Sequence, residues 1–70
     1  MSRHVIQSGL TYGFDHALGY WYTQYDRETG EVKSEGDSRS GMSRSDFIGV
    51  LQEHNAPEEH CTSVALDLPF

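Results

Sequence analysis

The sequence predicts an α+β fold, a three-stranded antiparallel β-meander packed on one face by a C-terminal pair of short helices. Two patterns lead to this prediction: an aromatic strand, a turn and a polar strand within residues 20–35, and two helical patterns within residues 43–68. The size of the chain limits the core, because a chain of 70 residues buries only about 60% of its unfolded surface. We therefore expect a single small domain over residues 1–70, with its sheet covered on one face.

The first expected strand covers residues 4–12, which contain both apolar and polar side chains. Gly9 interrupts this segment, which indicates a bulge or a bend. Residues 13–19 begin and end with glycine and predict a tight connection to the next strand. In that connection Asp15 is expected to cap a turn and His16 to be exposed.

The clearest prediction is a hairpin over residues 20–35. Residues 20–25 carry aromatic and β-branched side chains, which favour strands. Asp26 at the first position and Gly30 at a position of positive φ predict a turn. A loop of residues 27–30 then pairs Tyr25 with Val32 in the returning strand.

Alternation along the two strands of this hairpin predicts which side chains share a face. The face expected to pack on the helices carries Trp21, Thr23, Tyr25, Val32 and Ser34. The face expected to meet water carries Tyr20, Tyr22, Gln24, Lys33 and Glu35. A slip of one residue in register would exchange the faces of one strand relative to the other.

The first helix is expected to begin at Ser43. Asp46 follows at the spacing of a capping box, and Met42 and Phe47 stand at the positions of a hydrophobic staple. Its apolar face comprises Phe47, Val50, Leu51 and His54. Asn55 suits the C-terminal cap.

Pro57 suits the first position of a second helix, where its missing N–H costs no hydrogen bond. Cys61, Val64, Ala65 and Leu68 form its apolar stripe. Pro69 indicates that this helix ends by Leu68. The two helices resemble a helix-turn-helix in outline, but the second begins with Glu58 and contains no Lys or Arg, so it suits the major groove of DNA poorly.

The charge balance narrows the classes of partner. Eleven acidic and five basic residues give a net charge of −6, whereas phosphate backbones and anionic membrane surfaces attract clustered Lys and Arg. We therefore expect no direct nucleic-acid binding and no membrane association. The sequence also offers no apolar run of the kind found in signal peptides or membrane spans, so a cytoplasmic location is expected.

Histidine and cysteine side chains are the candidates for metal binding or catalysis. His54 and His60 are separated by six positions across a helix break, which does not match the usual spacing of zinc ligands. Cys61 is expected to be a small buried apolar residue. A reactive thiolate is not expected at this position, because the negative charges of Glu58 and Glu59 would raise the pKa of the thiol. We predict no catalytic residue, no metal site and no cofactor.

The aromatic hairpin carries the functional hypothesis, because Tyr and Trp are enriched in protein interfaces. The predicted partner-binding residues are Tyr20, Tyr22, Gln24, Lys33 and Glu35. The sequence thus indicates a small acidic, non-catalytic module, an adaptor or inhibitor, that binds another protein or a second copy of itself.

Two alternatives stay open. One is an acidic mimic of nucleic acid, of the type carried by phages and mobile elements, that occupies a basic groove. The other is a metal- or ligand-binding domain that uses His16, His54, His60 and Cys61.

Overall fold

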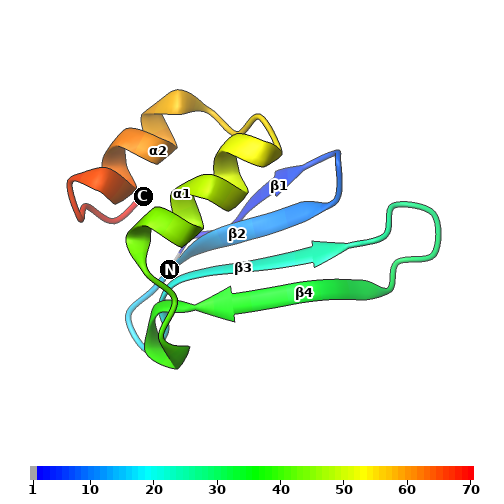
Figure 1. The fold of residues 1–70 in the computed structure, drawn as a ribbon, viewed down its shortest axis with the longest axis horizontal. Helices are drawn as coiled ribbons and strands as arrows, with labels where there is room; N and C mark the ends of the chain where they lie inside the picture. The colour runs from blue at the N-terminus through cyan, green and yellow to red at the C-terminus, as the bar shows by residue number, and fades with distance from the viewer. Residues whose placement is uncertain (1) are drawn as a thin grey trace.

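The computed structural model describes residues 2–70 of the chain. The elements follow in the order β1 (His4–Ile6), β2 (Leu10–Asp15), β3 (Gly19–Tyr25), β4 (Val32–Asp37), the 3-10 helix η1 (Ser38–Ser40), α1 (Arg44–Glu53) and α2 (Glu58–Ala65). The four strands form one antiparallel sheet in the order β1-β2-β3-β4. Both helices lie on the same side of this sheet (Figure 1). The α+β class and the helix pair are confirmed, whereas the prediction of three strands is wrong.

The additional strand arises at Gly9, where the expected bend is a complete reversal of the chain. Gly9 has a φ angle of +106° and its N–H donates to the carbonyl group of Ile6. A β-carbon at this position would collide with the carbonyl oxygen of Tyr25. A backbone with positive φ and no room for a side chain requires glycine, so the predicted first strand divides into β1 and β2.

The predicted connection of residues 13–19 is shorter than expected, because β2 continues through Gly13 to Asp15. The carboxylate of Asp15 accepts a hydrogen bond of 2.7 Å from the N–H of Ala17, and His16 is exposed. Asp15 therefore caps a tight turn, as the sequence predicts, and no helical turn forms there.

The β3–β4 hairpin has the predicted turn. Tyr25 pairs with Val32, and the N–H of Asp26 donates to the carbonyl group of Glu31 over 2.8 Å. Beyond the turn, Gln24 pairs with Ser34, because a β-bulge shifts the register by one residue. The bulge changes the β3 residues with which Ser34 and Glu35 share a face: Ser34 lies with Gln24 on the helix side, and Glu35 lies with Thr23 on the other side.

The first helix begins as the sequence predicts. The Ser43 hydroxyl group accepts a hydrogen bond of 3.1 Å from the N–H of Asp46. The helix ends at Glu53, and Asn55 follows the cap residue His54 with a φ angle of 56°. An asparagine in this left-handed conformation is a common way to end a helix.

The second helix starts one residue later than predicted, with Pro57 as its N-cap, and ends at Ala65. The predicted apolar stripe of this helix is correct for Val64, which is buried. It is wrong for Ala65 and Leu68, which are exposed. None of the helices within residues 2–70 is long and apolar enough to cross a membrane.

The core lies between the helices and the inner face of the sheet. Its buried members are Leu10, Tyr12, Tyr20, Phe47, Leu51 and Val64. Two strands and both helices supply them. The opposite side of the sheet carries the residues that alternate with Leu10, Tyr12 and Tyr20. No layer formed by residues 2–70 covers that side, and we call it the open face.

Candidate functional site

The structure exchanges the two faces of strand β3 relative to the prediction. Tyr20 is only 4% exposed and Tyr22 packs against the core cluster. The Tyr20 hydroxyl group donates to the carbonyl group of Leu68 over 2.9 Å. The predictions that Tyr20 and Tyr22 meet water and that Trp21, Tyr25 and Val32 pack on the helices are therefore wrong.

The remaining predicted contact residues do not form one surface with the two tyrosines. Gln24 shares the helix side of β3, where it is half-buried. Lys33 and Glu35 are exposed on the edge strand β4. Because of the bulge, Glu35 stands opposite Thr23 and belongs to the open face. The predicted set is thus divided between the two sides of the sheet.

The signal that identifies the inner face lies in β2 rather than in the hairpin. Leu10, Tyr12 and Phe14 alternate with Thr11 and Gly13 along this strand. The larger apolar side chains of β2 must be buried, and the register places Tyr20 opposite Phe14 and Tyr22 opposite Tyr12 on the same side. A period-two reading of residues 10–15 predicts the correct core face.

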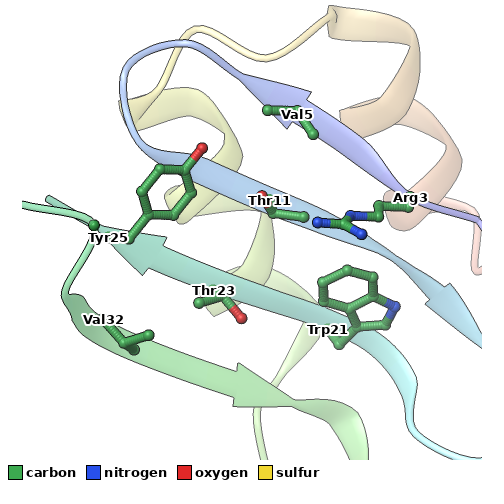
Figure 2. Close-up of a pocket in the computed structure, with 8 residues that line it drawn as sticks. Arg3, Val5, Thr11, Trp21, Thr23, Tyr25 and Val32 are labelled. Atoms are coloured by element: carbon green, nitrogen blue, oxygen red, sulfur yellow. The ribbon is translucent and has the colours of Figure 1, made fainter. Parts of the chain in front are cut away.

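A groove of about 470 Å³ crosses the open face. Figure 2 shows its side chains standing on neighbouring strands, with Trp21, Thr23 and Tyr25 in a line along β3. The lining residues are Arg3, Val5, Thr11, Trp21, Thr23, Tyr25, Gly30 and Val32. Val5 and Val32, on the two edge strands, are each 60% exposed. The groove therefore presents apolar surface from one edge of the sheet to the other.

The charges of the open face stand at opposite edges. Arg3 precedes β1 and lines the groove. A second hollow of about 350 Å³ is lined by Trp21 and Thr23 and, on β4, by Glu35 and Asp37. The open face therefore has a cationic side chain that reaches from the β1 edge toward Trp21 (Figure 2), two carboxylates at the β4 edge and an aromatic ridge between these edges.

A second cluster of polar and aromatic side chains lies on the helix side, beneath the C-terminal residues. The rings of His4 and His60 have centroids 4.4 Å apart, and the Phe70 ring lies 5.3 Å from His4 and 5.0 Å from His60. The Tyr12 hydroxyl group lies 2.5 Å from Nδ1 of His60. We call His4, Tyr12, His60 and Phe70 the histidine cluster.

The environment of two members of the histidine cluster, His4 and Tyr12, favours their uncharged forms. Burial, together with the nearby His60, lowers the pKa of His4 below its usual value. Burial, with a smaller contribution from Cys61, raises the pKa of Tyr12. Nε2 of His4 is buried and has no hydrogen-bond partner among the described residues. The cluster therefore acts as an aromatic contact between β1, β2, α2 and the C-terminus.

The histidines and the cysteine that could serve as metal ligands are dispersed. His54 bonds through Nδ1 to the Ser8 hydroxyl group over 2.7 Å, while exposed His16 stands beside the ring of Phe14. Cys61 is half-buried, and burial followed by the charge of Glu58 raises the pKa of its thiol. Within residues 2–70 no three His, Cys, Asp or Glu side chains lie close enough to hold a metal ion.

Comparison of the chain with protein-family models, with curated proteins and with solved structures found no match.

Proposed function

We propose that this protein is a small, non-catalytic protein-binding module, an adaptor or inhibitor, whose contact surface is the open face of its sheet. One observation carries the proposal: the groove is lined by exposed Val5 and by the half-buried aromatic side chains of Trp21 and Tyr25, on a sheet face that no element within residues 2–70 covers. Exposed apolar surface that is continuous across several strands marks sites of interaction.

The composition of the open face supports a protein as the ligand. Trp and Tyr are the residues most often found as energetic anchors of protein interfaces, where charged groups occupy the rim. Trp21 and Tyr25 lie on the inner strand β3, and Arg3 and Glu35 stand toward the edges. Threonine side chains between the aromatic rings add polar contacts without adding charge.

Site-specific photocrosslinking tests this proposal. A photoreactive phenylalanine derivative is introduced at Val5 or at Val32, and for the control at Gln52, which is exposed on the helix side. Illumination of cells that express each variant should yield protein adducts from the two open-face positions and none from position 52. Equal adduct yields at the three positions, or no adduct from the open face, would refute the proposal.

A further inference from the structure

We infer that the occupant of the open face is a second copy of this chain, related by a two-fold axis that runs parallel to the strands between β2 and β3. This inference rests on the proposed function and names the partner. In such an arrangement two sheets pack face to face, as in aligned β-sandwiches. Strand β1 of each copy lies over β4 of the other, and β2 lies over β3.

The strand register determines which residues would meet. Asp37 stands opposite Trp21, and Trp21 opposite Gly13, which forms one row across the sheet. The chain before β1 reaches the same row, because the N–H of Ser2 donates to the carbonyl group of Phe14. A two-fold rotation about an axis parallel to the strands exchanges the two ends of such a row, and the row keeps its position along the strand direction. Arg3 of one copy therefore approaches Asp37 of the second copy.

The next row shows the same complementarity. Val5 pairs with Thr11, Thr11 with Thr23 and Thr23 with Glu35. The two-fold axis brings Val5 of one copy over Glu35 of the other. The aliphatic stem of the glutamate can cover the valine while its carboxylate stays at the wet rim, as long charged side chains do.

The position of Trp21 favours two-fold symmetry over an unrelated partner. A β-carbon on Gly13 would lie 3.1 Å from Cζ2 of Trp21, so the indole ring leans from β3 over the backbone of β2. It thus lies near the middle of its row, where the proposed axis passes. Two copies would bring their Trp21 rings together at the centre of the interface, and aromatic pairs at a buried centre are strong anchors.

The distribution of charge explains why the β1 edge of one copy must meet the β4 edge of the other. A net charge of −6 on each copy opposes association in general. The cation at the β1 edge and the carboxylates at the β4 edge turn this repulsion into local attraction only when opposite edges meet. A two-fold axis satisfies both edges at once, because every contact in such an interface occurs twice.

A charge reversal across the two edges tests this arrangement by sedimentation equilibrium over about 1 to 200 μM protein. The unmodified chain should sediment as two copies. Val5→Glu puts a carboxylate against Glu35 of the second copy and should weaken dimerisation at least about tenfold. Adding Glu35→Lys should restore the dimer. Within one chain these positions lie three strand spacings apart, about 14 Å, so the rescue reports a contact between copies.

Gln52→Glu, with the same charge added to the helix side, is the matched control and should leave the mass unchanged. Melting temperatures close to that of the unmodified chain would show that each variant is folded. Fluorescence of Trp21, the single tryptophan, should change on dilution of the unmodified chain but not of Val5→Glu. A single-copy mass throughout the series, or a Val5→Glu dimer as tight as the original, would overturn the inference.

The proposed function and this inference fail in different ways. If crosslinks from Val5 and Val32 join the chain to a different protein while the purified chain sediments as a single copy, the open face binds a partner and only the inference is wrong. If neither position gives an adduct, both are wrong.

Discussion

The Tyr12 hydroxyl group and Nδ1 of His60 lie 2.5 Å apart, although 48 positions separate the two residues in the chain. This contact joins the central strand β2 to the last helix α2. When His60 carries its proton on Nε2, the Tyr12 hydroxyl donates the hydrogen bond. Tyr12 is fully buried, so the bond has little competition from water.

Replacing Tyr12 with phenylalanine tests the contribution of this bond. The change removes the hydroxyl group and keeps the ring, and it leaves His60 without its partner, so the free energy of unfolding should fall by about 1 kcal/mol. Urea titration followed by circular dichroism measures the change. Tyr25→Phe is the matched control on the open face and should alter stability by less than about 0.5 kcal/mol. Equal losses in the two variants would contradict this account.

The stability of the protein should decrease as the pH falls below the ordinary pKa of histidine. Because the pKa of folded His4 is lowered from 6.5 by burial and by His60, the unfolded chain binds a proton more readily than the folded one. The contribution of neutral His4 is complete above pH 6.5 and is lost as the pH decreases toward the folded pKa.

Urea titrations at a series of pH values between about 8 and 5 detect this loss. His4→Phe removes the titrating ring and should flatten part of the profile. His16→Asn, at an exposed position, should leave the profile unchanged. A profile that His4→Phe does not alter would show that another group controls stability in this range.

Phe70 is expected to stabilise the fold although it is the last residue of the sequence. Its ring lies within 6.4 Å of the ring centroids of His4, Tyr12, Tyr20, Phe47 and His60. Phe70→Ala should cost about 2 kcal/mol, less than a fully buried phenylalanine, and lower the melting temperature by roughly 10 °C in a chain of this size.

Leu68→Ala is the matched control, because the Leu68 side chain is 50% exposed while its backbone carbonyl group keeps the bond to Tyr20. Calorimetry should show a much smaller decrease for this variant. If both variants have the melting temperature of the unmodified chain, the C-terminal residues do not contribute to the core.

Two glycine-to-alanine changes should have opposite effects. At Gly13 a new methyl group would collide with the carbonyl oxygen of Ser2 and press against Trp21, so Gly13→Ala should destabilise the protein by about 1–3 kcal/mol. At Gly49, within α1, no atom lies within 4 Å of the added carbon. Gly49→Ala should therefore stabilise the protein by about 0.5–1 kcal/mol.

Thermal unfolding compares the two glycine variants directly, and the near-ultraviolet circular dichroism of Trp21 should change only in Gly13→Ala. Stabilisation by both changes would mean that the N-terminal segment does not lie against β2 as described.

The features that the sequence predicts correctly depend on residues close together in the chain. Ser43 caps α1 because its partner, the N–H of Asp46, is three residues away. Asp26 forms the hairpin turn because its carboxylate accepts hydrogen bonds from the N–H groups of Glu28 and Thr29, which also lower its pKa. Such contacts involve only a few backbone angles, so a short stretch of sequence specifies them.

The open face could not be assigned from the hairpin, because alternation divides side chains into two faces without stating which one is buried. Tyr20 and Trp21 are both large aromatic residues that could occupy either side. Pairing with β2 decides the matter, since Phe14 stands opposite Tyr20 and only one side of β2 can join the helices. The bulge then moves Glu35 to the same face as Trp21.

The α+β class, the hairpin turn, the helix pair and the start of α1 therefore follow from the sequence. The outward side of Trp21, the inward side of Tyr20 and the meeting of His4, His60 and Phe70 follow from the packing of the folded chain. Local hydrogen bonds act over a few residues and can be read in order along the chain. Burial depends on which distant segments pack together, and that choice exists only once the sheet and the helices have assembled.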